Sequence, residues 1–292
     1  MWNLIRAEWL KLTRRPIVWI LLAVFLGLLA VQILTQFALV SLIGERVSSP
    51  ALESQIEEWR RRTVFPGLFG VVFNHLNGLG GIFAVVLAAA AMGSEYSWGT
   101  LRTQLARQPS RGRLLVAKLV TLLALLVVAA LLALALGSLL GGMLGGLRGS
   151  AGTVTQADLL QLPLALLRAL YVLLPYVLLT LCLTVLGRSL LVGLAGGLLY
   201  LVFEVGLGAL ALFQVLGGVW QLIYSLTPGQ NINTLALMNS HAFGLSPENV
   251  TTMDLSTLPS PLQATLVIAV YCALFLATAL YELRRRDVFG PS

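Results

Sequence analysis

The chain has 292 residues, of which 58% are hydrophobic and only 11% are charged, and its mean hydropathy is +0.90. A soluble domain carries about 25% charged residues, and a water-soluble fold of this size cannot bury so much apolar surface. The composition therefore excludes an ordinary soluble domain and predicts an all-α membrane protein, with lipid as part of the solvent. The net charge of +7 does not indicate a nucleic-acid partner, because the basic residues cluster beside apolar runs rather than forming a separate basic domain.

The first residues predict a short helix that lies in the membrane interface. Trp2, Ile5, Trp9 and Leu12 recur on one helical face, while most of the neighbouring basic side chains point elsewhere. The apolar run that follows Pro16 is longer than the core of a signal peptide, and no small-x-small cleavage pattern follows it. We therefore expect this run to remain as the first membrane span.

Six apolar runs along the chain are long enough to cross the hydrocarbon core, which takes about 20 residues. They predict one transmembrane domain over residues 1–292 with six transmembrane helices, and the expected spans are 17–40, 67–92, 119–147, 163–186, 190–213 and 262–283.

The connection between the last two spans, residues 214–260, is too apolar for a solvated loop, yet its apolar pieces are too short to span. Such pieces are typical of re-entrant or interfacial segments. We therefore expect a re-entrant outer segment with two short helices, at about 217–226 and 231–243, on either side of a turn at Thr227–Pro228–Gly229. The polar stretch 47–62 predicts an amphipathic segment on the same outer face.

The distribution of lysine and arginine predicts the orientation. With the N-terminus inside, the cytoplasmic segments hold 13 of these residues and the outer loops hold five. The run Arg60–Arg62 goes against this bias, but the overall excess decides the orientation under the positive-inside rule. We expect a multi-pass protein of the plasma membrane with both termini in the cytoplasm.

The connection between the second and third spans, residues 93–118, is the most informative stretch. Its apolar side chains recur at helical spacing opposite a basic face, and Gln108–Pro109–Ser110 breaks the pattern. This predicts a short cytoplasmic helix, a turn and the start of the next span. The alternative is a basic loop that only sets the orientation and binds no partner.

This stretch resembles the permease subunits of ABC-2 type exporters. The residues that carry the resemblance are Glu95–Tyr96, Gly99–Thr100–Leu101–Arg102, Arg107, Arg111 and Lys118, together with Glu8, Lys11, Leu12, Arg14 and Arg15 before the first apolar run. The six-span layout and the apolar connection before the last span extend the resemblance over essentially the whole chain.

The resemblance implies a membrane permease driven by a separate ABC ATP-binding subunit, in two copies. The cytoplasmic connection would act as a coupling helix that contacts this subunit, with the N-terminal helix packed against the same region. The implied coupling residues are Glu95, Tyr96, Gly99, Thr100, Arg102, Arg107, Arg111 and Arg113. Six spans match half of such a transporter, which implies a second copy of the permease or a related permease.

The sequence contains no GxxxxGK[ST] phosphate loop, and Lys11 and Lys118 are its only lysines. We therefore expect the chain to bind no cofactor itself, and ATP and magnesium to bind in the partner ATPase. Two other classes stay open: an ion-coupled secondary transporter, for which Glu204 is a single weak indication, and an intramembrane enzyme, which the lack of GxSxG and HExxH motifs disfavours.

A few polar residues fall inside the predicted spans. Glu204 and Arg168 differ in depth by about 6 Å at ~1.5 Å per residue, so we expect them to form an ion pair. Asn74 and His75 lie towards the outer half of the second span, and we expect His75, like His241, to be a structural histidine. No metal site is predicted, because neither histidine has further ligands near it in the sequence.

Glycines recur every fourth residue in the third span, at Gly137, Gly141, Gly145 and Gly149. Such a strip lets another helix approach closely. The neighbouring helix could belong to the same chain or to a second permease, and the spacing does not separate the two.

Overall fold

The computed structural model describes residues 1–43, 50–99, 110–149, 151–210, 218–245 and 258–285. Within these ranges the regular structure is helical, apart from one isolated β-bridge between Phe65 and Gly152. Six helices are long and apolar enough to cross a membrane. The prediction of an all-α protein with six candidate spans is therefore confirmed.

The six long helices are α2 (Pro16–Ile43), α4 (Gly67–Ser97), α6 (Arg111–Arg148), α7 (Gln156–Gly187), α8 (Leu190–Leu210) and α12 (Pro261–Arg285). Two of these helices extend beyond the predicted spans at their N-terminal ends. Helix α6 begins at Arg111, directly after the predicted break at Gln108–Pro109–Ser110, whereas the predicted span begins at 119. Helix α7 begins at Gln156, before the predicted span at 163, because Thr155 and Asp158 form a capping box that starts the helix well before Pro163.

Four shorter helices complete the described part: α1 (Trp2–Thr13), α3 (Pro50–Thr63), α10 (Gly218–Ser225) and α11 (Pro228–Ala242). The two short helices predicted between the last spans are α10 and α11. They differ in environment. α11 packs against α4, α7 and α12 and buries much of its length, whereas α10 leaves apolar side chains such as Val219 and Leu222 exposed.

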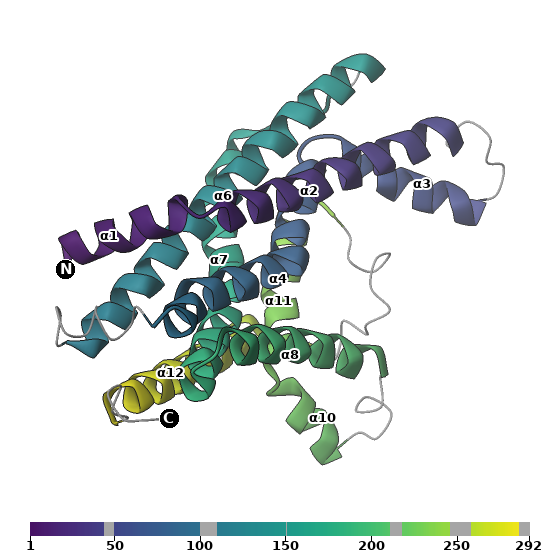
Figure 1. The fold of residues 1–292 in the computed structure, drawn as a ribbon. Coiled ribbons are helices and arrows are strands. Elements are labelled where there is room, and N and C mark those ends of the chain that lie inside the picture. The colour runs from purple at the N-terminus through teal and green to yellow at the C-terminus, as the bar shows by residue number, and fades with distance from the viewer. Residues whose placement is uncertain (44–49, 100–109, 150, 211–217, 246–257, 286–292) are drawn as a thin grey trace.

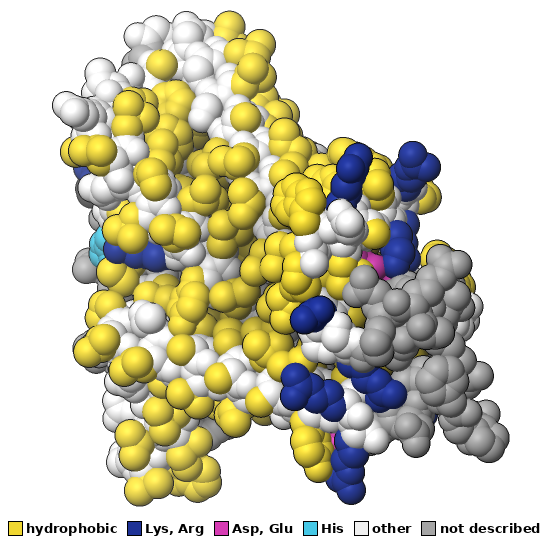
Figure 2. All heavy atoms as spheres, turned by 90° about the vertical axis from the view of Figure 1, so that its left-hand side faces the viewer, with side chains coloured by type: hydrophobic (Ala, Val, Ile, Leu, Met, Phe, Trp, Pro, Cys, Tyr) yellow, Lys and Arg dark blue, Asp and Glu magenta, His cyan; other side chains and the backbone are white. Residues whose placement is uncertain are grey.

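The bundle is built around α4 and α7, which are the most buried of the long helices. α4 contacts α2, α6, α7, α8 and α11, whereas α8 and α12 bury little of their length. Helix α1, the start of α6 and the end of α12 lie at one end of the bundle (Figure 1). Figure 2 looks onto this end and shows basic side chains gathered in one part of it, beside broad hydrophobic areas. We call it the basic end.

The glycine strip of α6 packs against α4 of the same chain. A Cβ atom added at Gly137 would lie 2.5 Å from the Cγ2 atom of Val72, and one at Gly141 would overlap the side chain of Leu68. Real Cβ atoms do not approach so closely, so these two glycines let the helices touch. The strip therefore serves packing within the chain.

The other two glycines of the strip lie near the end of α6. A Cβ atom at Gly145 would overlap Ala151, which follows the helix. Gly149 ends the helix with a φ of 71°, a left-handed conformation that glycine adopts without strain. Gly145 thus also packs within the chain, and Gly149 acts as a helix terminator.

The contrast between neighbouring glycines gives a test of this packing. Gly141→Ala should lower the melting temperature of the detergent-purified protein, because overpacking costs about 1–3 kcal/mol. Gly142 has open space around it and is the matched control. Gly142→Ala should leave the melting temperature unchanged or raise it, since alanine favours helix by about 1 kcal/mol. Equal destabilisation by both would contradict the assignment of the strip to α4.

Candidate functional site

Four charged side chains meet at the basic end of the bundle. The Nζ atom of Lys118 lies 2.7 Å from Glu8 Oε2 and 2.6 Å from Glu95 Oε1. The Nζ atom of Lys11 lies 2.6 Å from Glu8 Oε1 and 3.5 Å from Glu95 Oε1. We call Glu8, Lys11, Glu95 and Lys118 the ion cluster. Its two positive and two negative charges balance.

The ion cluster is buried. Glu8, Glu95 and Lys118 have exposed fractions of 2%, 1% and 0%, while Lys11 lies at the edge. Lys118 also donates to the carbonyl oxygen of Ala91 at 3.1 Å, so its three N–H bonds have three acceptors. A buried charge costs several kcal/mol unless it is paired and hydrogen-bonded, and this arrangement meets both conditions.

The surroundings of Glu8 set its protonation. Burial alone raises the pKa of this carboxyl, but the ammonium groups of Lys118 and Lys11 outweigh burial and hold the pKa below its ordinary value. Glu8 is therefore charged at neutral pH, as the salt bridges require.

The ion cluster joins three helices. Glu8 and Lys11 come from α1, Glu95 from the last turns of α4, and Lys118 from the second turn of α6. α4 and α6 flank the predicted coupling connection. Salt bridges therefore join α1 to both α4 and α6, the helices that residues 100–109 connect.

Arg15 adds a second tie between the start of the chain and α4. One of its Nη atoms donates to the carbonyl oxygen of Ala90 at 2.8 Å and to the hydroxyl of Ser94 at 2.6 Å. Its guanidinium lies 5.0 Å from the centre of the Trp98 ring, within the range of a cation–π contact. The junction of α1 and α2 is therefore fixed against the last turns of α4.

The structure divides the predicted coupling residues into three groups. Glu95 is in the ion cluster, and Tyr96 and Gly99 lie at and just beyond the end of α4. Arg111 and Arg113 belong to the first turn of α6, which follows the predicted break at Gln108–Pro109–Ser110. Thr100, Arg102 and Arg107 lie outside the described residues.

Sequence reasoning did not find the ion cluster, although α1 carried a signal for it. Glu8 falls on the same helical face as Ile5 and Leu12, so it is an acidic residue on the apolar face of an amphipathic helix. Lys118 is likewise a cation next to a long apolar run. Two opposite charges that face hydrophobic surroundings indicate a buried pair.

A cavity of about 890 Å³ lies within the bundle, among α4, α7, α8, α11 and α12. Its lining is apolar over most of its surface, with a set of polar side chains between the apolar ones. These polar residues are Gln32, Arg62, Asn74, Asn77, Tyr176, Tyr200, Glu204, Tyr224, Thr227, Gln230, Asn233, Ser240 and Tyr271. A cavity of this size and mixed lining is typical of a small-molecule site.

Glu204 lies at the wall of this cavity. Its Oε2 atom accepts a hydrogen bond from the hydroxyl of Tyr176 at 2.7 Å, and its Oε1 atom accepts one from Tyr200 at 2.7 Å. Gly229, at the start of α11, packs against this carboxylate, since a Cβ atom added there would lie 3.2 Å from Glu204 Oε1. Glu204 therefore connects α7, α8 and α11.

The predicted ion pair between Glu204 and Arg168 is wrong. Among the residues that the structure describes, no salt bridge includes Arg168, which is half-buried on α7. Tyr176 is the residue of α7 that contacts Glu204. Arg168 precedes Tyr176 by a little more than two helical turns, so at about 100° per residue its side chain points roughly 80° away from that of Tyr176 around α7. The prediction compared only positions along the helices and did not consider the direction of Arg168 around α7.

Asn74 and His75 are neighbours in the sequence but face different parts of the bundle. Asn74 lines the cavity, and its Oδ1 atom accepts a hydrogen bond from Ser240 of α11 at 3.0 Å. His75 faces α2 instead, with Nδ1 2.9 Å from Gln32 Oε1 and Nε2 3.0 Å from the carbonyl oxygen of Phe25. His75 is thus a structural histidine. In the described part of the chain, no cluster of three potential metal ligands occurs.

Among the residues that the structure describes, some buried polar groups beside the cavity have no hydrogen-bond partner. Both side-chain atoms of Asn77 and the Oε1 atom of Gln230 are in this state. Buried amide groups are costly without a partner, so these groups are available to a bound molecule. The arrangement can bind a ligand that offers both apolar surface and hydrogen-bonding groups.

Lys118 gives a direct test of the ion cluster. Lys118→Met should destabilise the detergent-purified protein by about 3–5 kcal/mol, because it leaves the buried Glu95 without its closest cation. Lys11→Met is the matched control, and it should cost at most about 1 kcal/mol because that side chain is partly exposed. Unfolding curves in mixed detergent measure both. A similar loss of unfolding free energy in the two variants would contradict this assignment, because it would show that the buried salt bridges of Lys118 contribute no more than an exposed ion pair.

The lowered pKa of Glu8 predicts a dependence of stability on pH. A carboxyl whose folded pKa lies below its unfolded value of about 4.3 contributes its full stability above that value. This contribution is lost as the pH falls through the folded pKa. Glu8→Gln should therefore reduce the difference in melting temperature between pH 7 and pH 4, whereas the exposed Glu57→Gln should not. If the melting temperature of Glu8→Gln depended on pH as that of the wild type does, Glu8 could not be a buried carboxylate with a lowered pKa.

Comparison with known proteins places the chain in a family. The family described as "Protein of unknown function (DUF2705)" matches residues 23–289, from α2 to beyond the end of α12. No curated protein matches this chain. Since the match covers nearly the whole sequence, the chain belongs to the DUF2705 family.

Proposed function

We propose that this chain is the permease subunit of an ATP-driven ABC-2 type transporter, an exporter that works with a separate ATP-binding subunit. The observation that carries the proposal is the ion cluster, which ties α1 to both helices that flank residues 100–109. A displacement of that connection by an ATPase would move these three helices together.

Helix α4 supplies the path from the ion cluster to the cavity. Glu95 lies near one end of this uninterrupted helix, and Asn77, which lines the cavity, lies about 27 Å away at ~1.5 Å per residue. Packed helices move as rigid bodies. A tilt imposed at the ion cluster would therefore shift one wall of the cavity, as alternating access requires.

The proposal includes the partners and the location. ATP and magnesium would bind in the ATP-binding subunit, present in two copies, and this chain would carry out no covalent chemistry. A second copy of the chain, or a related permease, would complete the transporter in the plasma membrane. The basic end would face the cytoplasm together with both termini, in agreement with the excess of lysine and arginine there.

Glu204 favours a second candidate, an ion-coupled secondary transporter. An ionisable side chain on an intramembrane cavity is typical of that class. The two candidates differ in their energy source. An ion-coupled transporter moves its substrate in vesicles that contain this chain alone and an imposed ion gradient, whereas the proposed permease needs ATP and its second subunit.

The docking of the ATPase can be tested at the predicted coupling residues. Arg102→Glu combined with Arg107→Glu should abolish co-purification of the ATP-binding subunit, because charge reversal at a docking surface costs several kcal/mol. Insertion and abundance should stay unchanged. The matched control is Arg60→Glu with Arg61→Glu on α3, which should leave the complex intact.

The alternative is that these arginines only bind anionic headgroups. In that case the Arg102 and Arg107 double variant would show altered orientation or abundance, but its correctly inserted fraction would still assemble and couple ATP hydrolysis to transport. Full assembly and coupled turnover would refute the docking assignment.

A further inference from the structure

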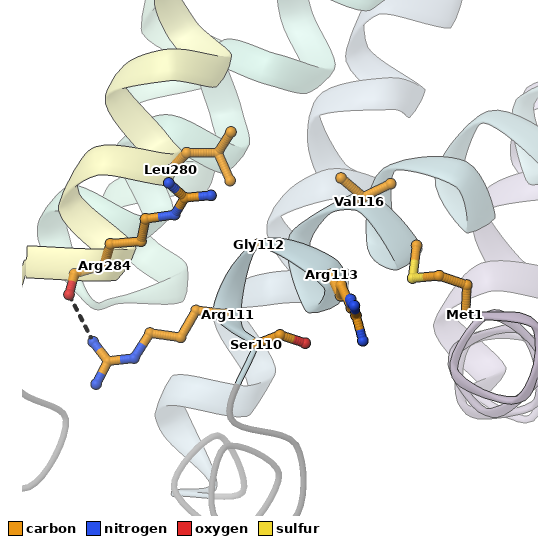
Figure 3. A pocket seen from close by; sticks show the side chains of 8 residues that line it. All are labelled: Met1, Ser110, Arg111, Gly112, Arg113, Val116, Leu280 and Arg284. Carbon is orange, nitrogen blue, oxygen red and sulfur yellow. Dashed lines mark hydrogen bonds between the residues drawn. The ribbon is translucent and has the colours of Figure 1, made fainter.

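A second pocket, of about 700 Å³, opens at the basic end of the bundle between the start of α6 and the end of α12. Figure 3 shows Arg111 and Arg113 on the first turn of α6 and Arg284 on α12, with Ser110 beside them. We call it the arginine pocket. It is separate from the cavity at Glu204, and the two share no lining residue.

The arginine pocket has a strong positive charge. None of its described lining residues is acidic. Arg113 and Arg284 are exposed, and among the described residues neither takes part in a salt bridge. Guanidinium groups without an acidic partner favour an anion, and guanidinium binds phosphate oxygens in bidentate fashion.

The backbone of the pocket adds to this charge. Ser110 is the N-cap of α6, and its side chain makes no capping hydrogen bond. The positive end of a long helix thus points at the pocket and favours an anion. Arg284 lies directly over this first turn, since a Cβ atom at Gly112 would be 3.3 Å from its guanidinium.

One arginine holds the two helices together and so fixes the shape of the pocket. Arg111 donates to the carbonyl oxygen of Leu283 at 2.8 Å. It also donates to the carbonyl oxygen of Arg284 at 3.3 Å, the bond drawn in Figure 3. Both acceptors are at the C-terminal end of α12, where free carbonyl groups favour a cation. The guanidinium groups of Arg113 and Arg284 are therefore the ones that can bind a ligand.

Apolar side chains lie in the same lining. Val116 is one turn further along α6 than Arg113, Leu280 is one turn before Arg284 on α12, and Met1 lies at the start of the chain. In Figure 3 the guanidinium of Arg284 lies beside Leu280, so cationic and apolar groups are close together. This combination matches an amphiphilic anion better than a free phosphate, which would leave the apolar side chains without a partner.

We propose that the arginine pocket binds an anionic phospholipid, with its phosphate at Arg113 and Arg284 and the start of an acyl chain at Val116 and Leu280. The lipid would bridge α6 and α12 and so connect the last span to the helix that carries Lys118. This inference is independent of the ATP-driven function, since it requires no partner subunit.

The test measures lipid binding by the purified full-length chain. Delipidated protein is titrated with phosphatidylglycerol or with phosphatidylcholine, and adducts are counted by native mass spectrometry. We expect the wild type to bind phosphatidylglycerol at least tenfold more tightly. Arg113→Gln with Arg284→Gln should weaken that binding about thirtyfold and leave phosphatidylcholine binding unchanged, from the usual contribution of two basic residues at a headgroup.

The matched control removes the same charge at the same end of the bundle. Arg6→Gln with Arg14→Gln changes two exposed arginines of α1 that do not line the pocket, and it should alter binding by less than twofold. An equal loss in both pairs would overturn the proposal in favour of general attraction between charges. If the pocket pair does not yield monodisperse protein, Arg284→Gln alone should weaken binding about fivefold.

Two further probes separate the lipid from a soluble phosphate. Inorganic phosphate and glycerophosphoglycerol, which is the headgroup without acyl chains, should not displace phosphatidylglycerol at millimolar concentration. Displacement by either would overturn the lipid assignment and show a site for a soluble phosphate. A wild-type protein without preference for phosphatidylglycerol would also overturn it.

Discussion

The salt bridges of Lys118 are the constraint on which the arrangement of the basic end depends. Lys118 is fully buried, and a buried ammonium is stable only if anions or carbonyl groups surround it. Its carboxylate partners come from two other helices, Glu8 on α1 and Glu95 on α4. An N-terminal helix of only twelve residues would be marginal on its own. The need to pair Lys118 therefore gives α1 a defined position against α4 and α6, the two helices that flank residues 100–109. A force applied to that connection would act on α1, α4 and α6 together, because salt bridges join these three helices.

The composition of α4 explains why this helix can lie at the centre of the bundle. Its middle and last turns are rich in alanine and glycine, so that neighbouring helices approach closely. At Gly93, for example, an added Cβ atom would lie 2.5 Å from the Cα atom of Leu190 at the start of α8. Close packing makes a helix stiff, and a stiff helix transmits a displacement along its length. One helix thus joins the charged end, through Glu95, to the polar cavity, through Asn74 and Asn77.

The sequence was sufficient for the features that depend on hydrophobicity along the chain and insufficient for those that depend on direction around a helix. The six spans and the two short helices before the last one follow from runs of apolar residues, so their positions could be predicted. The start of α6 at Arg111 follows the break predicted at Gln108–Pro109–Ser110, whereas hydropathy placed the span only from 119, because hydropathy detects only the part of a helix inside the hydrocarbon core. The pairing of Arg168 with Glu204 failed because similar depth says nothing about which way each side chain points. The ion cluster needs contacts between helices distant in the sequence, although the position of Glu8 on an apolar face indicated that a partner existed.

The polar contacts of α11 distinguish it from the other walls of the cavity. Ser240 donates to Asn74 of α4, and the side-chain amide of Asn239 donates to the carbonyl oxygen of Ala165 of α7 at 3.1 Å. A Cβ atom added at Gly229 would lie 3.2 Å from Glu204 Oε1, so α11 also packs closely against α8. Helix α11 buries much of its length against α4, α7 and α12, so packing and these hydrogen bonds hold it in place. Helix α8 has the smallest buried share of the six candidate spans. If the cavity opens on one side, α8 is therefore the wall whose movement disrupts the least packing, while the α4–α6 pair keeps its close contact at Gly137 and Gly141 and moves as one body.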